Sequence, residues 1–318
     1  MLHVSEAGIW AARRIPYMTR PVLWAWGRYY GRSRKRPHWL FTEMGNVANY
    51  RVPYRVRLRD GQLLDVAIND LTGQEICRLG YTEGPSLDIM TAIVKPGDTF
   101  FDLGAHVGHF TVVASRLVGA GGMVHSFEPD AETCRWLEGN VKVNSLANVT
   151  VNQAAVCDKV GYQDFELRTI DMMAANSLAK PNSSSGRFIR VRTTSIDEYC
   201  AEGSIKRIDF LKIDVEGAEI DVLRGARAAL SGEVKPKIHI EFHPKTQEAF
   251  GRSLPELAET LLACGYQLLR ITDEGPREFW LNSEEPRVFN VLALSSDDAK
   301  RLRPVLVESA IRNPEPGV

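Results

Sequence analysis

From residue 97 onward, hydrophobic positions alternate between short continuous runs and stretches with helical spacing. Runs such as "FFDL" and "IDFLKID" predict buried strands, whereas apolar residues at i, i+3 and i+4 predict amphipathic helices. The expected strands and helices cover 100–103, 109–118, 122–127, 130–144, 148–156, 190–200 (a strand and then a short helix), 208–214, 218–230, 236–244 and 253–266. Strands that alternate with helices of this length predict an α/β fold with a mostly parallel sheet covered on both faces.

The two ends of the chain follow other patterns. Strands are expected at 266–271 and 288–295 with no helix between them, which predicts an antiparallel edge. Nearer the start, "YRVRLRD" and "QLLDVAI" alternate in polarity around an Asp-Gly turn, which is a hairpin signal, and helices are expected at 71–79 and from Pro85 onward. The patterns therefore predict a helical extension, a hairpin and helix subdomain, an α/β domain and a tail, at 1–50, 51–96, 97–300 and 301–318.

Charge and cysteine content narrow the class of protein. The formal net charge of the 318 residues is −1, so no overall field points to nucleic acid. The five cysteines are scattered without C-x-x-C spacing, which argues against a disulfide framework and a zinc site. We find neither an apolar run of about 18 residues nor a signal-peptide pattern, and we expect a cytoplasmic protein.

The first 40 residues are strongly basic. They carry eight Arg or Lys against one acid, with Trp and Tyr interleaved. This composition suits peripheral contact with an anionic membrane, a glycan or a partner, and equally a helical extension whose aromatic side chains cover the main domain. This arm, or an exposed edge strand, offers a surface for a homodimer.

A glycine-bearing loop follows the first strand of the α/β domain. Asp102, Gly104, Ala105 and Gly108 lie between that strand and the next helix, whose free N–H groups suit a nucleotide. Glu128 ends the second strand twenty-four residues after Gly104, where an acid can accept hydrogen bonds from ribose hydroxyls. The pair predicts an adenosine cofactor, without separating a dinucleotide from S-adenosylmethionine.

Small and acidic side chains follow the next strands. Ala154 and Ala155 would leave a slot for a flat adenine. Asp214, Glu216 and Glu219 cluster after the fourth strand, where acids also cap helix N-termini. At the end of the fifth strand, Glu241 and His243 share a face with His239. A carboxylate and an imidazole beside Asp214 predict either a divalent-metal site or a base that takes a proton from a hydroxyl.

These segments together resemble a known family. "DLGAHVGHFTVVAS", "FEPD", "NVTVNQAAVCD", "LKIDVEGAEIDVLRGA" and "IEFHP" are similar in order and spacing to the FkbM-type S-adenosylmethionine-dependent methyltransferases, over about 81–244. The family usually has Asn where this chain has His106. The resemblance implies a Rossmann-like class I methyltransferase sheet of seven strands with an antiparallel last strand. It also implies a cofactor site at Asp102, Gly104, Ala105, His106, Gly108, Glu128, Pro129, Ala155 and Asp214.

The implied activity is methylation of a hydroxyl oxygen on a sugar, a glycan or a secondary metabolite. Asp214, Glu241 and His243 are the candidate catalytic residues: either His243 serves as the base, or the three hold a divalent metal ion that acidifies the hydroxyl. Three alternatives stay open: an NAD-dependent oxidoreductase, disfavoured by the absent third glycine of the dinucleotide fingerprint, a nucleic-acid methyltransferase, and a non-catalytic protein that binds S-adenosylmethionine or acts as a scaffold.

Overall fold

The computed structural model describes residues 53–67, 70–167, 177–178, 187–279 and 287–312. The predicted extension at 1–50 and residues 180–186 of the polar loop "KPNSSSGR" lie outside these ranges. Among the described residues, no helix combines the length and the apolar character that a membrane span requires.

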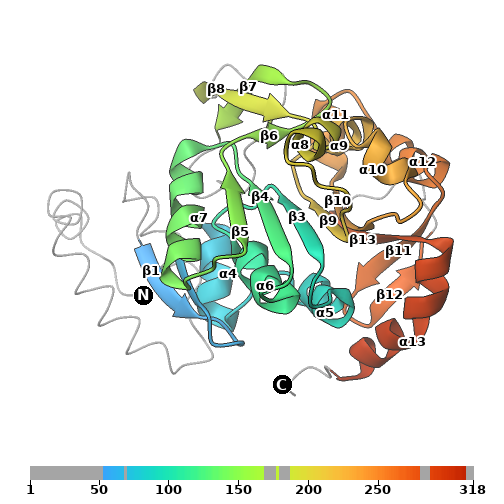
Figure 1. Cartoon of the computed structure of the whole chain (residues 1–318), viewed down its shortest axis with the longest axis horizontal. Coiled ribbons are helices and arrows are strands. Elements are labelled where there is room, and N and C mark those ends of the chain that lie inside the picture. The colour runs from blue at the N-terminus through green and yellow to red at the C-terminus, as the bar shows by residue number, and fades with distance from the viewer. Residues whose placement is uncertain (1–52, 68–69, 168–176, 179–186, 280–286, 313–318) are drawn as a thin grey trace, which may run out of the picture.

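A single sheet of eight strands forms the centre of the α/β domain (Figure 1). Its order is β12-β11-β13-β10-β9-β3-β4-β5. The strands are β3 (Thr99–Leu103), β4 (Met123–Phe127), β5 (Val149–Asn152), β9 (Phe210–Ile213), β10 (Lys237–Phe242), β11 (Tyr266–Thr272), β12 (Gly275–Glu278) and β13 (Phe289–Ser295). The five strands from β5 to β10 pair in parallel, so the predicted Rossmann-like α/β fold is confirmed.

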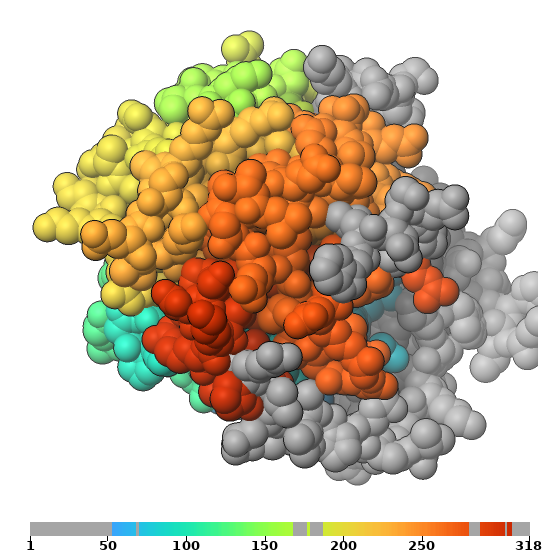
Figure 2. All heavy atoms as spheres, turned by 90° about the vertical axis from the view of Figure 1, so that its right-hand side faces the viewer, coloured from blue at the N-terminus to red at the C-terminus, as the bar shows by residue number. Residues whose placement is uncertain are grey.

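The end of the sheet differs from the expected edge of two strands. β13 is antiparallel, as predicted, but it lies between β10 and β11 and pairs with both. Its residues from Val291 to Leu294 are fully buried, which explains why it is internal. β12 adds an eighth strand outside β11. Figure 2 faces this side of the molecule, where orange and red atoms from the C-terminal elements form the surface.

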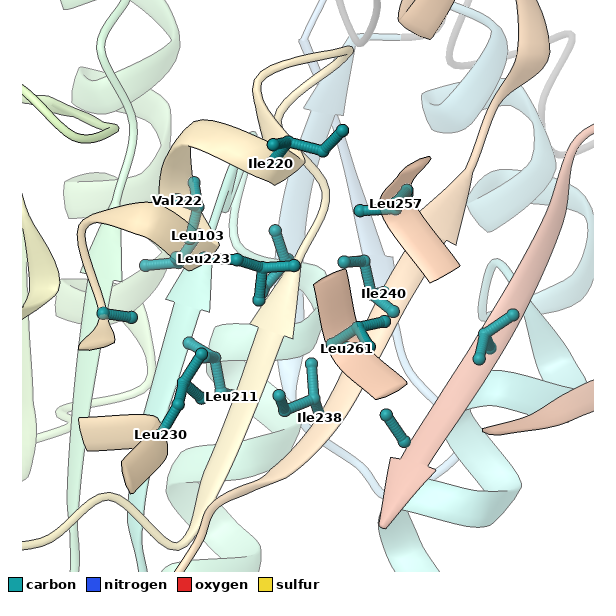
Figure 3. Close-up of a cluster of buried hydrophobic side chains, with 14 of the residues drawn as sticks. Leu103, Leu211, Ile220, Val222, Leu223, Leu230, Ile238, Ile240, Leu257 and Leu261 are labelled. Atoms are coloured by element: carbon teal, nitrogen blue, oxygen red, sulfur yellow. The ribbon is translucent and has the colours of Figure 1, made fainter. Parts of the chain in front are cut away.

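Helices cover both faces of the sheet. One face packs on α8 (Ile196–Glu202), α9 (Glu219–Arg224), α10 (Arg227–Ser231) and α12 (Leu254–Ala263); Figure 3 shows this cluster around Leu211, Ile238 and Ile240. The other packs on α4 (Leu71–Leu79), α5 (Gly84–Ile93), α6 (His109–Val118) and α13 (Ser296–Arg312). Successive strand residues point to opposite faces, so Phe210 joins the second cluster and Leu211 the first. Part of the predicted tail is thus the helix α13.

A smaller sheet interrupts the α/β alternation. The predicted strand at 148–156 consists of β5 and the two-residue β6 (Ala155–Val156), which pairs with β8 (Arg187–Thr194). β8 also pairs with β7 (Gly161–Leu167), a strand that the sequence reading missed. Ala155, Phe165 and Val191 form the core of this sheet beside the C-terminal end of the main one.

The predicted hairpin is present as β1 (Pro53–Arg57) and β2 (Leu63–Ala67). Asn140 of α7 (Ala131–Val143) holds it against the α/β domain. The Asn140 Oδ1 accepts from the Asp65 amide at 2.6 Å, while its Nδ2 donates to the Asp65 carbonyl at 2.9 Å and to the Val107 carbonyl at 2.8 Å. One fully buried side chain therefore joins the hairpin, α7 and the glycine loop.

Asn140→Ala should lower the free energy of unfolding by about 2–4 kcal/mol, because it leaves buried backbone groups of Asp65 and Val107 without these partners. Urea unfolding measures the change. Arg135→Ala, at an exposed position of the same helix, is the control and should alter stability by less than about 0.5 kcal/mol. Equal effects of the two substitutions would contradict the bridging role of Asn140.

Candidate active site

A cavity of about 370 Å³ opens at the C-terminal ends of the parallel strands, where open α/β sheets bind ligands. Its lining comes from the loop after β3, the ends of β4, β9 and β10, the small sheet, and the segments 72–83 and 288–290. The predicted site residues in its lining are Gly104, Ala105, His106, Glu128, Pro129, Ala155, Asp214 and Glu241. The volume lies within the usual range for ligand sites, about 300–1,000 Å³.

The glycine loop is shaped by contacts with its neighbours. Gly104 has a φ of 74°, and a Cβ there would lie 1.8 Å from the carbonyl oxygen of Asp214. The absent side chain therefore lets β3 and the end of β9 approach each other, and the positive φ suits a tight turn. Gly108, which does not line the cavity, precedes α6 with a φ of 91°. A Cβ at this position would lie 2.4 Å from Leu137, so Gly108 allows close helix packing.

Glu128 lies between the glycine loop and α7. It is 6% exposed, its Oε2 accepts from the amide of His106 at 3.1 Å, and its Oε1 accepts from the amide of Asp130 at 2.9 Å. A carboxylate offers about four acceptor positions, a number that suits these two amides and the two hydroxyls of a ribose. The buried Ala154 and Ala155 adjoin Glu128 in the lining, with Phe127 and Phe165. This donor end therefore suits a ribose and a flat base.

A buried row of charge runs beneath the cavity. Asp102 on β3, Lys212 on β9 and His239 on β10 are direct neighbours across the strands. Lys212 Nζ lies 3.7 Å from Asp102 Oδ1 and 3.1 Å from Asp214 Oδ2. Asp102 is fully buried outside the cavity lining and accepts from the Thr111 hydroxyl at 2.6 Å. Its side chain therefore joins β3 to α6 and β9.

The titratable groups in and beside this row shift one another's pKa values. Burial lowers the pKa of Lys212, but the carboxylates of Asp214 and Asp102 outweigh burial and hold that pKa above its ordinary value. Burial raises the pKa of Asp102, which Lys212 opposes. Burial and then Lys212 lower the pKa of His239 to about 3, and the same two causes lower that of His109 to about 4. Lys212 is thus the buried cation, and the two histidines are neutral.

The opposite end of the cavity is acidic. Glu83, Asp214, Glu216 and Glu241 line it, and one carboxylate oxygen each from the last three lies within 4.8 Å of the others. Burial raises the pKa of Glu241 well above its ordinary value, and the charge of Asp214 adds to this. Three lining residues other than glycine have left-handed backbones: Glu83, His106 and Glu216, with φ of 50°, 50° and 56°. Such conformations cost free energy and concentrate at functional sites.

Two acidic or basic candidates lie outside the cavity lining. Glu219 accepts from the amides of Val215 and Gly217 at 3.2 and 3.1 Å, so it binds the loop before α9 and not the helix N-terminus, which has no side-chain cap. Burial raises its pKa to about 7. His243 is the N-cap residue of α11 (Pro244–Ala249), and burial lowers its pKa. Its role as base stays a prediction. The predicted metal ligands were Asp214, Glu241 and His243. In the described part of the chain, the group that could share one ion consists of Asp214, Glu216 and Glu241, with Glu216 instead of His243.

The polar lining residues that sequence reasoning missed include Glu83, Lys212 and Asn290. Lys212 had a signal, because a lysine inside the apolar run "FLKI" of a buried strand needs a buried partner. Glu83 and Asn290 had none, since each lies in a segment without a recognisable motif.

The sheet order, the glycine loop and the acid at the end of β4 are the features of a Rossmann-like methyltransferase fold. Residues 102–268, just over half of the chain, match the family model described as the methyltransferase FkbM domain. The chain belongs to this family, and the predicted family is confirmed. Its cofactor is S-adenosylmethionine, and the donor end fits a ribose and a base as described above.

Three curated relatives resemble the chain in part. The 31-O-demethyl-FK506 methyltransferase FkbM of Streptomyces tacrolimicus is 30% identical over 43% of this chain and 62% of its own length. The 2-O-methyltransferase NoeI of Sinorhizobium fredii is 25% identical over 45% of this chain and 63% of its own. The hexuronic acid methyltransferase AglP of Haloferax volcanii is 28% identical over 56% and 67%. The chain thus spans less than two thirds of the first two.

Lys212→Met should destabilise the protein by about 3–5 kcal/mol at pH 7, because it leaves Asp102 and Asp214 without their buried cation. The pKa of Asp102 is raised in the folded state, so its ionised form opposes folding above that pKa. The loss should therefore shrink as the pH falls and Asp102 takes up a proton. Urea unfolding at pH 7 and pH 5 measures both effects.

The double variant Lys212→Met with Asp102→Asn is the control, since it removes both charges of the closest strand-to-strand pair. Its loss of stability should be smaller than the sum of the two single losses. Additive losses, or a loss for Lys212→Met that grows toward pH 5, would show that the pair does not balance charge.

Proposed function

We propose that the chain transfers a methyl group from S-adenosylmethionine to a hydroxyl oxygen of a sugar, a glycan or a secondary metabolite. The observation that carries the proposal is that one cavity joins the ribose-binding end at Glu128 to an end lined by several carboxylates. Carboxylates accept hydrogen bonds from hydroxyl groups and take up their protons. An acceptor with hydroxyl groups therefore fits the acidic end.

The roles of the residues follow from their positions. When bound, S-adenosylmethionine supplies a methyl group carried on a positively charged sulfur. Glu128 would hold the ribose hydroxyls, and Ala154 and Ala155 leave room for the adenine. Asp214 lines the acidic end, its carbonyl lies next to Gly104, and Lys212 binds its carboxylate. The protein contributes mainly alignment, which can supply roughly 7–11 kcal/mol in favourable cases.

The relatives support this acceptor class. Their names specify a 31-O-demethyl-FK506 methyltransferase, a 2-O-methyltransferase and a hexuronic acid methyltransferase. Transfer to oxygen on a sugar or a natural product is the chemistry that these names share. For the whole chain, a small-molecule or glycan acceptor agrees with the size of the cavity.

A divalent cation is a second way to activate the hydroxyl. Asp214, Glu216 and Glu241 are close enough to share one ion, which would acidify a bound hydroxyl. The ammonium of Lys212, 3.1 Å from Asp214, opposes a further cation there. Loss of turnover with EDTA and its recovery with Mg²⁺ would favour the cation, whereas unchanged turnover would favour a side-chain base.

A cytoplasmic location, peripheral membrane contact through the basic residues 1–50 and a homodimer remain predictions. The support for membrane contact is the excess of Arg and Lys among interleaved Trp and Tyr in the first 40 residues.

Glu128→Ala should weaken the binding of S-adenosylmethionine and of S-adenosylhomocysteine alike, by roughly 10- to 100-fold. Both ligands contain the ribose whose hydroxyl groups would donate hydrogen bonds to this carboxylate. Calorimetric titration measures the affinities, with NAD as the competing cofactor. The wild-type protein should bind the first two and not NAD.

Glu138→Ala, at an exposed position of α7, is the matched control and should leave the affinities unchanged. Tight binding of NAD would overturn the proposal in favour of an oxidoreductase. Binding of S-adenosylmethionine without methyl transfer to any hydroxyl acceptor would favour the non-catalytic alternative.

A further inference from the structure

Glu83 enters the active site from outside the family domain. It is the residue before α5, nineteen positions ahead of the matched segment 102–268, and it lines the acidic end of the cavity. Its backbone is left-handed, with a φ of 50°, although its side chain forms no capping bond to α5. Capping by the side chain therefore does not explain this strained conformation. The conformation does place the side chain of Glu83 in the cavity lining.

Asn290 holds the carboxylate of Glu83. Its Nδ2 donates to Glu83 Oε2 at 2.7 Å and lies 3.1 Å from the hydroxyl of Ser86. Asn290 lies on β13 directly opposite Glu241 on β10, so the register of the sheet fixes its position. The other oxygen of Glu83, Oε1, has no hydrogen bond within the described part of the chain. One oxygen is thus anchored and the other is left for a ligand.

Three other carboxyl groups in or near the site suit a base less well. Burial and then the charge of Asp214 raise the pKa of Glu241 well above its ordinary value, which disfavours its ionised form. Asp214 is engaged by Lys212 at 3.1 Å. Glu219 lies outside the cavity lining and accepts a hydrogen bond from the amide of Gly217 in the preceding loop. Burial, followed by the charge of Asp214, raises the pKa of Glu83 to about 7, near the working pH of a general base.

We infer that Glu83 accepts the proton of the acceptor hydroxyl and that Asn290 is the positioning residue that fixes its carboxylate. This inference rests on the methyl transfer proposed above, and the atoms and electrons of the step balance as follows. The acceptor oxygen forms its bond to the methyl group while the proton leaves that oxygen for Glu83 Oε1. The electron pair of the old sulfur–methyl bond remains on sulfur, which loses its positive charge.

A base within reach of the acceptor oxygen also lies near the positively charged sulfur. A nearby cation lowers the pKa of a carboxyl group. Five side chains of the protein face Glu83: Lys212 and Asp214 at β9, Glu75 on α4, Glu241 on β10 and the neutral Asn290 on β13. These side chains are the same whether S-adenosylmethionine or S-adenosylhomocysteine is bound. S-adenosylhomocysteine has a neutral sulfur and otherwise the same charged groups, so comparing the two ligands isolates the sulfonium charge.

The test is the number of protons released on binding, from calorimetric titration at pH 7 in buffers of different ionisation enthalpy. A group with a pKa of about 7 is half protonated there, so S-adenosylmethionine should release up to about half a proton more than S-adenosylhomocysteine. Glu83→Gln, which can keep the bond from Asn290, should reduce this difference by at least half. Glu138→Gln, at an exposed position of α7 outside the cavity lining, should leave it unchanged.

Methyl transfer gives a second readout, with tritiated S-adenosylmethionine and a panel of neutral methyl glycosides. Glu83→Gln should lower kcat by at least about 100-fold and abolish the rise of kcat/KM for S-adenosylmethionine between pH 6 and 8, which reports the free enzyme. Asn290→Ala should lower kcat more than it changes KM. An unchanged proton difference in Glu83→Gln overturns the assignment whether or not a glycoside reacts, as does turnover within threefold of wild type.

The two proposals fail in different ways. Absence of S-adenosylmethionine binding by the wild-type protein would remove the proposed function and the role of Glu83 together. Turnover by the wild-type protein that persists in Glu83→Gln would leave the function and remove only the base.

Discussion

The buried contact of Lys212 with Asp102 and Asp214 is the interaction on which the active site depends. Asp102 and Lys212 are paired across β3 and β9, and Asp214 follows Lys212 by two residues. Each of these charges would be costly to bury alone. Together they allow a cavity with several carboxylates to lie above a packed apolar face. The contact also joins the strand that carries the glycine loop to the strand that carries Asp214.

The backbone imposes a second constraint at the same two strands. The carbonyl of Asp214 occupies the space that a side chain at Gly104 would fill. A larger residue at 104 would therefore push the donor end away from the acidic end. The left-handed backbones of His106 and Glu216 lie on either side of this contact, in the loops after β3 and β9. Close approach of the loops and local backbone strain thus occur together, which is typical of functional sites.

The donor end of the site could be predicted because each of its residues directly follows a strand that has a clear apolar pattern. Gly104, Glu128 and Asp214 lie far apart in sequence, but parallel strands bring their carboxyl ends to one edge. The same logic failed for Glu83 and Asn290, which are 207 positions apart and meet only because β13 inserts beside β10. No local pattern reports such an insertion.

The strands, too, could be predicted where the apolar pattern is clear and were missed where it is weak. β9 and β10 are apolar and were expected, whereas β12 has the sequence Gly-Pro-Arg-Glu, whose polar residues give no strand signal. β7 alternates weakly and is largely held by its pairing with β8. Pairing partners that are distant in sequence thus override local propensity at the edges. In the buried centre, the apolar pattern alone determines the strands.

The acidic end of the site combines residues from inside and outside the family domain. Residues within 102–268 form the donor end and also supply Asp214, Glu216 and Glu241 to the acidic end, which Glu83 and Asn290, before and after that range, complete. The sheet register places Asn290 opposite Glu241, so β13 is fixed relative to the family domain by backbone pairing. A substitution at Glu83 or Asn290 can therefore change the acidic end while Glu128 keeps its contacts with the glycine loop.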